Sequence, residues 1–347
     1  MSERSKPRVL IVTPAAAKSN NGNWQTAWRW AGFLKRDFEV AIDQSWRGAP
    51  CDVLLALHAR RSADDIAAWA QAQGLTRNVR RLGVVLTGTD LYRDIETDAA
   101  AKRSLELARA LVVLQEKGPD RLPAGLRSKT RVIFQSTTTR QTLAKTPRHL
   151  RVVMVGHLRD EKLPQTLYQA VRLLKPENGV LIDHIGDPLD ADLAAQARAT
   201  AAACPHYRWL GGLSHEATRR HIQRAHVLVH ASKMEGGAHV VMEAVCSGTP
   251  VLASKMDGNV GMLGANYAGY FEVGDAKSLA ALLTRLRSEQ MSPEEGYEGD
   301  KRNKDRLYSK LMQQCAQRAP LFAPETEKSA LIRLVKDLLN KTEAGKR

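Results

Sequence analysis

The sequence predicts an α/β protein with two doubly wound, Rossmann-like domains that face each other across a cleft. Short β-branched runs alternate with amphipathic helical stretches, which is typical of βαβ units and parallel sheets. This alternation stops at the polar stretch 137–148 and then starts again. The chain has 347 residues, more than one hydrophobic core usually organises, so two domains of ~150–190 residues are expected.

The elements follow in order along the chain. In the first half the expected strands are RVLIVTP, FEVAID, DVLLALH, RLGVVLTG, ALVVLQ and TRVIFQS, and the helices are 24–34, 63–73 and 98–108. In the second half the strands are LRVVMVGHL, VLIDHIGD, YRWLGGL, AHVLVHAS and TPVLAS, and the helices are 163–174, 190–203, 215–223 and 238–246. Residues 296–304 are expected to form a loop, and 327–340 an amphipathic tail helix.

This pattern predicts three parts: a first domain over 1–147, a second domain over 148–325, and a C-terminal helix within 326–347. Whether that helix packs back on the first domain stays open at this stage. In doubly wound domains ligands bind at the carboxyl ends of the strands, so candidate residues are sought there.

Composition narrows the class of protein. No apolar run approaches the ~20 residues that span a bilayer, so no membrane insertion is expected. The four cysteines are widely spaced without a CxxC pair, which fits a reducing cytoplasm. The net charge is +15, but basic residues are dispersed and aromatic residues make up only 5%, which disfavours nucleic acid as a partner. The remaining explanations of the positive charge are anionic small substrates, plain solubility and loose association with a membrane surface. The sequence does not indicate an oligomeric state.

The strongest motif is SKMEGGAHVVMEAVCSGTPV, which begins at Ser232. Glu235 and Glu243 are separated by seven residues, and glycines follow the first of them. Because these glycines leave the backbone uncovered just before a helix, the first free N–H groups of that helix can face a diphosphate. The motif resembles the donor site of retaining GT-B glycosyltransferases, and this resemblance implies that Glu243 reaches ribose hydroxyls and that Glu235 binds sugar hydroxyls beside the anomeric carbon. The expected donor-binding residues are Gly22, Gly212, Gly236, Gly237, Ala238, His239 and Glu243.

This segment resembles the donor site of retaining GT-B glycosyltransferases. VGHLRDEKL, from Val155, is similar to the strand-to-loop segment in which that family's Arg and Lys clamp the leaving diphosphate. Lys162 stands where the Lys is expected, whereas His157 occupies the usual Arg position and Arg159 follows two residues on. The resemblance covers about 151–287, with weaker pieces at IGDP, LGGL and YFEVGD. It implies a UDP-sugar donor and catalytic roles for Arg159, Lys162 and Glu235, with the sugar and the role of His157 undecided.

The first half of the chain contains the candidate residues for binding the acceptor. A loop that ends in a helix N-terminus offers N–H groups to an anion, and Gly22 lets a substrate approach the backbone. Further polar groups stand at later strand ends, where Asp90 shares the same cleft. The expected acceptor-binding side chains are Lys18, Asn20, Asn23, Thr26, His58, Arg60 and Thr89.

NNGNWQTAWRWA and RLGVVLTGTDLYRDI closely resemble segments of the selenosugar synthases of selenoneine biosynthesis. This resemblance, and not spacing or charge, implies transfer from a UDP-sugar to selenophosphate, which gives a 1-seleno-sugar. The stereochemistry of transfer stays open, as does the place where the phosphoryl group is lost.

Two rivals remain. An ordinary hexosyltransferase with a sugar or lipid acceptor would need an exposed apolar or aromatic groove, which Trp24, Trp28 and Trp30 could supply. A glycosyltransferase-like binding protein without catalysis is the other.

No metal or cofactor is expected. Asp190 and Asp192 match a DxD string but begin a helix, where acidic residues suit the helix dipole. His226 and His230 lie too far apart on a strand to chelate one ion and are expected to be satisfied core or rim side chains. No Gly-x-Gly-x-x-Gly follows a strand, which disfavours dinucleotide chemistry.

Overall fold

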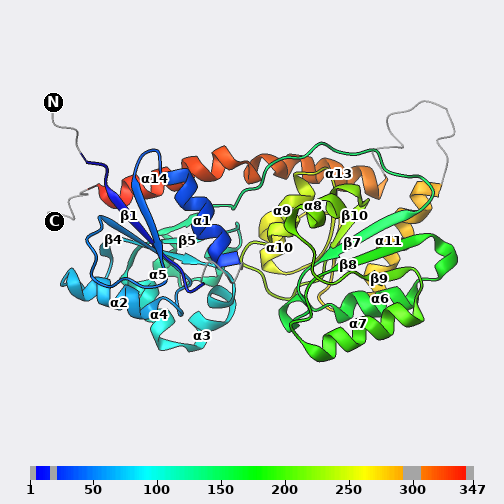
Figure 1. Ribbon diagram of the computed structural model, residues 1–347, viewed down its shortest axis with the longest axis horizontal. Helices are drawn as coiled ribbons and strands as arrows, with labels where there is room; N and C mark the ends of the chain where they lie inside the picture. Colours follow the sequence, from blue (N-terminus) through cyan, green and yellow to red (C-terminus); the bar gives the residue numbers. More distant parts are fainter. Residues whose placement is uncertain (1–4, 16–21, 292–305, 341–347) are drawn as a thin grey trace. The chain divides into compact units, whose positions relative to one another are not determined.

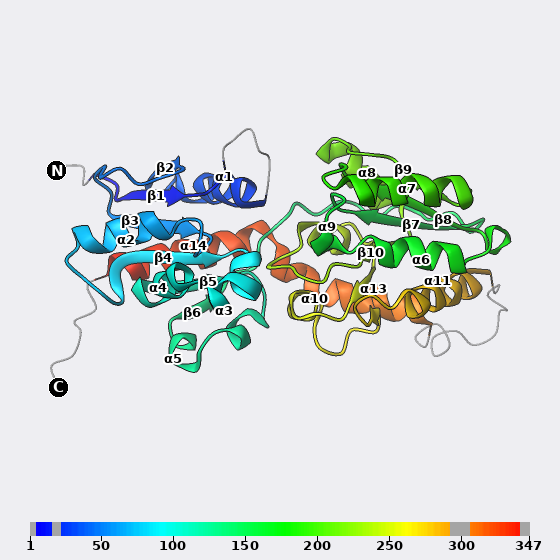
Figure 2. The same ribbon diagram turned by 90° about the horizontal axis from the view of Figure 1, so that it is seen from below.

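A computed structural model describes residues 5–15, 22–291 and 306–340. The chain divides into two compact units, Met1–Gln135 with Pro324–Arg347, and Ser136–Ala323. Each unit is built on one parallel six-stranded sheet with helices packed against it (Figures 1 and 2). The predicted α/β fold class with two doubly wound sheets is therefore confirmed.

The first unit has the strand order β2-β1-β3-β4-β5-β6. Its strands are β1 (Arg8–Val12), β2 (Glu39–Asp43), β3 (Val53–Leu57), β4 (Val79–Leu86), β5 (Ala108–Val113) and β6 (Thr130–Val132). Its helices are α1 (Gly22–Leu34), α2 (Ala63–Ala72), a π-helix η2 (Asp90–Asp94), α3 (Ile95–Thr97), α4 (Ala99–Leu107), α5 (Ala124–Arg127) and α14 (Pro324–Leu339).

Alternation along the strands decides which helices cover which face of this sheet. Leu10 and Val12 lie in one buried cluster with side chains of α2 and α4, whereas Val9 and Ile11 lie in another with side chains of α1 and α14. Successive strand residues point to opposite faces, so a run of apolar residues supplies both clusters at once.

The tail helix α14 packs on the first unit, which answers the question that the sequence left open. Glu327, in its first turn, has a fully buried side chain that pairs with Arg29 of α1, Oε2 to Nε, at 2.9 Å. Its Oε1 accepts hydrogen bonds from Arg29 Nη2 at 3.1 Å and from Trp30 Nε1 at 2.6 Å. The buried carboxylate of Glu327 therefore joins α14 to α1 within the first unit.

The second unit has the order β12-β11-β10-β7-β8-β9. Its strands are β7 (Leu150–Val155), β8 (Val180–Ile185), β9 (Tyr207–Trp209), β10 (Val227–His230), β11 (Val251–Ser254) and β12 (Tyr270–Phe271). Its helices are α6 (Gln165–Leu173), α7 (Ala191–Ala203), α8 (His215–Arg224), α9 (His239–Val245), α10 (Asp257–Leu263), α11 (Ala276–Met291) and α13 (Leu307–Arg318).

The direction of strand order reverses between β7 and β10 here, and between β1 and β3 in the first unit. At such a reversal the connections leave toward opposite sides, which opens a crevice at the carboxyl ends of the two strands. Each unit therefore has one place where its own topology favours a ligand.

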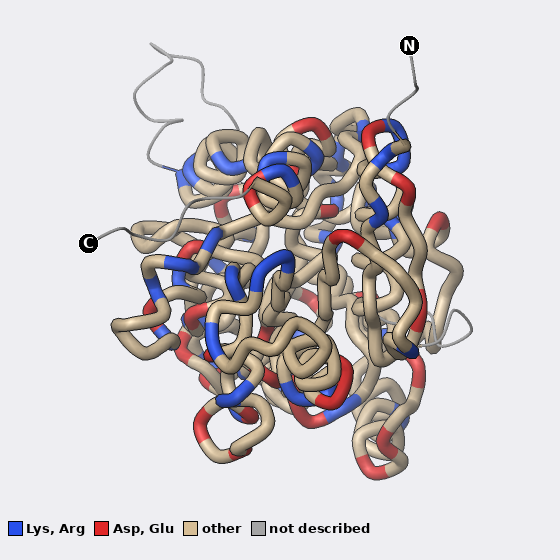
Figure 3. Tube along the Cα trace, turned by 90° about the vertical axis from the view of Figure 1, so that its left-hand side faces the viewer, with Lys and Arg blue, Asp and Glu red and all other residues tan. Residues whose placement is uncertain are grey.

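The expected strands and helices are present, with shifted ends. The sequence pattern misses η2, α3, α5, α10 and β12, and the loop expected at 296–304 lies outside the described residues. Among the described residues no helix combines the length and apolar character that a bilayer crossing needs. Lys and Arg are interspersed with Asp and Glu along the visible chain (Figure 3).

The predicted domain boundary after residue 147 lies later than the boundary between the units, which falls after Gln135. The segment 136–147 belongs to the second unit because α8 holds it. Arg219 donates to Thr137 Oγ1 at 2.6 Å and to the Thr138 carbonyl at 2.9 Å. Lys145 Nζ in turn donates to the Gln223 carbonyl at 2.6 Å.

Replacing Glu327 with Ala should lower the free energy of unfolding by about 3–5 kcal/mol, because Arg29 would keep a largely buried charge without its partner. Guanidinium-induced unfolding measures this. The matched control is Glu325→Ala, since Glu325 lies in the same first turn of α14 but its side chain is 81% exposed. Equal stability of the two variants would contradict the role given to the buried pair.

Candidate functional site

The crevice at the strand reversal of the second unit is lined by the segments that follow β7 and β10. The first contains the short helix η4 (Asp160–Lys162), and the second contains Lys233 and Glu235. The Lys233 N–H donates to the Glu161 carbonyl at 3.0 Å, and Lys233 Nζ pairs with Asp160 at 2.7 Å. These bonds hold the two segments side by side.

Glu235 and Lys162 form an ion pair at this point. Their side chains are 15% and 14% exposed, respectively. Glu235 Oε1 also accepts a hydrogen bond from Ser232 Oγ at 3.0 Å, while its Oε2 accepts none among the described residues. Burial alone would raise the pKa of Glu235, but the Lys162 ammonium and His230 outweigh it and hold this pKa well below its usual range. Glu235 is therefore a carboxylate at any working pH.

His230 supports this carboxylate from the end of β10. Its Nε2 lies 3.7 Å from Glu235 Oε1, and its Nδ1 bonds to Asn259 Oδ1 at 2.9 Å. Asn259 is itself oriented, because its Nδ2 donates to the Ser254 carbonyl at 2.9 Å. The prediction that His230 is a satisfied buried side chain is confirmed, but the sequence reasoning missed that it faces Glu235. Its place at the end of a strand beside the reversal was the available signal.

Two glycines let backbone segments approach within this site. A Cβ on Gly258, in α10, would lie 2.2 Å from the carbonyl oxygen of Glu235. A Cβ on Gly186, just after β8, would lie 1.9 Å from the carbonyl oxygen of Gly156. Because both obstacles are backbone atoms, no rotamer change could relieve either clash. The sequence analysis did not single out Gly258, whereas Gly186 belongs to the IGDP segment named there.

Glu243 lies on α9 in a different environment from Glu235. Its side chain is 5% exposed, and Oε1 accepts a hydrogen bond from His215 Nε2 at 2.6 Å. Arg219, whose side chain is 2% exposed, lies 3.8 Å from the same oxygen. The sequence reasoning named neither His215 nor Arg219, because both come from α8 and contact Glu243 only through the fold.

Arg159 and His157 lie on the segment after β7. Arg159 is exposed, and within the described residues its guanidinium has no hydrogen-bond or ion-pair partner. His157 Nδ1 accepts the Asp187 N–H at 3.2 Å, so a neutral ring carries its proton on Nε2. Partial burial lowers the pKa of His157, and Arg159 and Lys162 lower it further against the opposing effect of Asp187. At neutral pH His157 is thus a neutral donor, and Arg159 is a freely available cation.

The predicted anion site at the start of α9 is only partly open. Gly236 is buried, and the Ala238 N–H already donates to Met262 Sδ at 3.2 Å. Gly237 and His239 are partly exposed. Of the four predicted positions, the structure therefore leaves these two best placed to meet a ligand.

Gly212 follows β9 and is exposed beside Asp187. A Cβ there would lie 1.8 Å from Asp187 Oδ1, so the glycine leaves room for that carboxylate.

The predicted residues of the first unit separate into exposed and buried groups. Lys18 and Asn20 lie outside the described residues. Gly22 begins α1 and is exposed, and Asn23 is partly exposed beside it. Thr26 is buried: its hydroxyl donates to the Gly22 carbonyl at 2.7 Å and accepts a hydrogen bond from Gln135 Nε2. Direct contact between Thr26 and a substrate is therefore corrected to a role in holding the start of α1.

His58 requires the same correction. His58 follows the end of β3 and is only 2% exposed. Its backbone is in the left-handed region, with φ at 73°. Nδ1 accepts the Arg61 N–H at 3.2 Å, so Nε2–H donates to Thr89 Oγ1 at 3.1 Å. Asp90 accepts the N–H groups of Ala59 at 2.9 Å and of Thr87 at 2.8 Å, which ties the two strand ends together. Thr89 is partly exposed, so it can meet a ligand while His58 orients it.

The remaining predicted polar residues have local partners. Arg60 pairs with Asp98 at 3.0 Å while staying half exposed. Asp190 caps α7, since its Oδ1 accepts the N–H groups of Asp192 and Leu193, both at 3.0 Å. This cap accounts for the acidic string that otherwise resembles a metal-binding motif.

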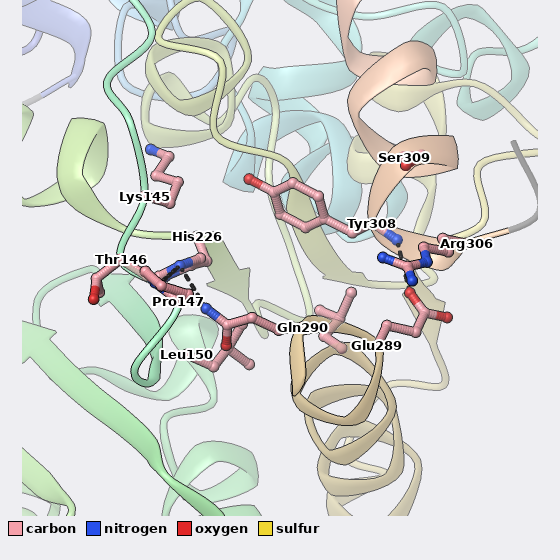
Figure 4. Close-up of a pocket in the computed structure, with 11 residues that line it drawn as sticks. Lys145, Thr146, Pro147, Leu150, His226, Glu289, Gln290, Arg306, Tyr308 and Ser309 are labelled. Carbon is pink, nitrogen blue, oxygen red and sulfur yellow. Dashed lines mark hydrogen bonds between the residues drawn. The ribbon is translucent and has the colours of Figure 1, made fainter. Parts of the chain in front are cut away.

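A cavity of about 260 Å³ lies elsewhere in the second unit, between residues 145–150, the end of α11 and the start of α13 (Figure 4). Tyr308 reaches into it from α13, and Gln290 lines it from α11. Leu150 begins β7 and His226 precedes β10, so this cavity is at the amino edge of the sheet, opposite Glu235. His226 is satisfied as predicted, because it accepts the Arg151 N–H at 2.9 Å and bonds to the Thr146 carbonyl at 2.9 Å.

Comparison with known structures decides the fold. Sucrose-phosphate synthase from Thermosynechococcus elongatus superposes with a TM-score of 0.71 at 16% identity, over 96% of this chain and 99% of that one. Alr3699/HepE from Anabaena, in complex with UDP, superposes with a TM-score of 0.68 at 13% identity, over 96% of this chain and 100% of that one. The fold is GT-B.

Sequence comparison agrees for the second unit of this GT-B chain. Residues 135–303 match the family of glycosyl transferases group 1. The amylovoran biosynthesis glycosyltransferase AmsK of Erwinia amylovora is 31% identical over 148 residues. That segment covers 40% of this chain and 36% of the relative, so the match spans about a third of the relative's length.

Replacing Gly258 with Ala should displace the Glu235 carbonyl and slow a reaction in which Glu235 takes part by about tenfold or more, because misplacement of a reacting or binding group by about 1 Å costs up to ~100-fold. Steady-state kinetics with the donor measure this. The control is Gly125→Ala, since a Cβ there has nothing within 4 Å. Equal activity of the two variants would mean that the close approach does not position Glu235.

Replacing Lys162 with Met should lower kcat/KM by about 10²–10³-fold, because a preorganised charge in the crevice is lost. Without the ammonium, burial raises the pKa of Glu235, so the acid limb of the pH–rate profile should move to higher pH. Lys255→Met is the matched control, since Lys255 is an exposed lysine that pairs with the exposed Glu272 instead of Glu235. An acid limb that stays in place would show that Lys162 does not hold Glu235 ionised.

Proposed function

We propose that this chain is a glycosyltransferase that moves a hexosyl group, glucose or N-acetylglucosamine, from a UDP-sugar to selenophosphate. The observation that carries the donor half is the Lys162–Glu235 pair at the strand reversal of the second unit. The acceptor half rests on the similarity of NNGNWQTAWRWA and RLGVVLTGTDLYRDI to the selenosugar synthases. The second unit is thus assigned the donor and the first unit the acceptor.

On the donor side each charged side chain is assigned to one part of the UDP-sugar. The sugar hydroxyls bind Glu235, whose Oε2 has no partner among the described residues. The ribose hydroxyls bind Glu243, which lies toward the C-terminal end of α9. Arg159 and Lys162 meet the diphosphate and stabilise the charge that develops as UDP departs. These two cations take the part that a metal ion plays in other transferases, so we propose a reaction without a metal.

On the acceptor side the reversal between β1 and β3 brings the carboxyl end of β1 beside that of β3, with Val12 paired to Ala56. Of the residues predicted there, Gly22, Asn23, Arg60 and Thr89 are exposed or partly exposed. Selenophosphate is a small anion whose selenium is already anionic, so it needs positive and hydrogen-bonding recognition and little general-base help. The net charge of +15 suits two anionic substrates.

The reaction breaks the C–O bond between the anomeric carbon and UDP, which leaves with the electron pair. Selenium of selenophosphate supplies the pair for the new C–Se bond. The product is a sugar selenophosphate, and water then cleaves its P–Se bond to give phosphate and the 1-seleno-sugar. Glu235 and Lys162 act by stabilising charge and position, so neither has to transfer a proton.

A second candidate, transfer to a sugar acceptor, is favoured by one specific observation. Trp28 of α1 is 64% exposed, while Trp30 is fully buried in the core. An exposed indole is a good platform for a sugar ring or another apolar surface. The curated relative named above acts in the biosynthesis of amylovoran, which also favours this alternative.

The deciding experiment incubates the protein with UDP-glucose or UDP-N-acetylglucosamine and follows UDP release and product mass. We expect release that depends on selenophosphate and yields the mass of a seleno-sugar, with Glu235→Gln inactive. Phosphate and simple sugars serve as control acceptors. Release that requires a sugar acceptor would overturn the selenium assignment and keep the donor site. Tight UDP binding without release under any condition would overturn catalysis altogether.

A further inference from the structure

The contact between His215 and Glu243 stands out because the two side chains differ so much in exposure. The His215 side chain is 75% exposed and that of Glu243 is 5% exposed, yet His215 Nε2 and Glu243 Oε1 are 2.6 Å apart. An exposed imidazole thus bonds to a nearly buried carboxylate. The imidazole stands between that carboxylate and solvent.

The other side of the carboxylate is closed by groups that cannot move aside easily. Arg219 is buried, and it donates to Thr137 Oγ1 at 2.6 Å and to the Thr138 carbonyl at 2.9 Å. His215 is the first residue of α8, whose N-cap Ser214 accepts the Ala217 N–H at 3.3 Å. The backbone of His215 is therefore anchored, while its side chain is free to rotate into solvent.

We propose that His215 is a specificity-determining residue that occupies the hydrogen-bond position of a ribose hydroxyl on Glu243 and yields it to a nucleotide with an intact ribose diol. This inference rests on the proposed function, in which Glu243 binds the ribose. A ribose hydroxyl replaces the hydrogen bond that His215 gives up, so the exchange leaves Glu243 satisfied. A nucleotide without these hydroxyls offers no replacement, and a buried carboxylate left without a partner is costly.

The exchange links nucleotide binding to pH. The hydrogen bond to Glu243 raises the pKa of His215, while partial burial lowers it and the Glu243 charge raises it. Arg219 on the same helix and Arg140 from the segment 136–147 also face the ring and lower its pKa. Glu216 lies next along the helix, but Arg140 and Arg220 pair with it.

The sign of the linkage follows from the exchange. Loss of the Glu243 partner on nucleotide binding lowers the pKa of His215, so binding releases a proton. Affinity for a ribonucleotide therefore rises with pH between the ordinary histidine pKa and the raised one.

The test measures the affinity of UDP and of 2′,3′-dideoxy-UDP by calorimetry between about pH 6 and 9, around the titration of histidine. For the wild type we expect UDP affinity to rise up to about tenfold across this range, which is the effect of one pKa unit, and dideoxy-UDP affinity to rise less. His215→Gln should abolish this difference in pH dependence while keeping a hydrogen-bond donor. His215→Ala should tighten UDP several-fold and leave dideoxy-UDP unchanged.

His221→Gln is the matched control, because His221 lies on the same helix and faces Asp183 at 3.4 Å instead of Glu243. It should keep the wild-type profile with both ligands. Weaker UDP binding by His215→Ala, or an equal effect on both ligands, would overturn the proposal. Wild-type UDP affinity in Glu243→Ala would overturn both the proposal and the donor site. UDP binding with the expected profile but without transfer to selenophosphate would overturn only the acceptor assignment.

Discussion

A nearly buried carboxylate at the strand reversal of the second unit sets the conditions for the elements around it. Glu235 keeps its charge because Lys162 pairs with it and His230 stands behind it. Lys162 reaches it only because the segment after β7 runs beside the segment after β10, and Gly258 must lack a side chain for the backbone of Glu235 to lie where it does. Topology, backbone packing and electrostatics thus converge on one ionised side chain.

The two glutamates of the motif are equivalent in the sequence but not in the structure. Glu235 lies on an irregular segment, paired with a lysine, and keeps one oxygen without a partner among the described residues. Glu243 lies on a helix, bonded to an exposed histidine and near a buried arginine. The first is suited to hold charge beside a reacting centre, and the second to exchange one hydrogen bond for another. Environment, and not residue type, separates the two roles.

Much of this arrangement could be predicted from the residues alone. Apolar runs of strand length and helical periodicity identified both sheets, and the resemblance to a donor site assigned Glu235 and Lys162 to one site, where the structure pairs them. The failures share one physical cause. His215, Arg219 and Gly258 come from elements distant in sequence, and only packing brings them to the glutamates. Thr26 and His58 stand at the right strand ends, but sequence position alone does not show that neighbouring side chains bury them.

The return of α14 to the first unit has a consequence for how the protein is made. The first unit is discontinuous, since the chain leaves it after Gln135 and re-enters at Pro324. Leu331, Leu334 and Leu338 of α14 fill the face of the sheet that α1 shares, and Glu327 neutralises Arg29 there. The ribosome therefore synthesises the whole second unit before it synthesises α14, the helix that completes the first unit. Until α14 has been synthesised, the apolar strand residues that it covers stay exposed, and Arg29 lacks its counterion.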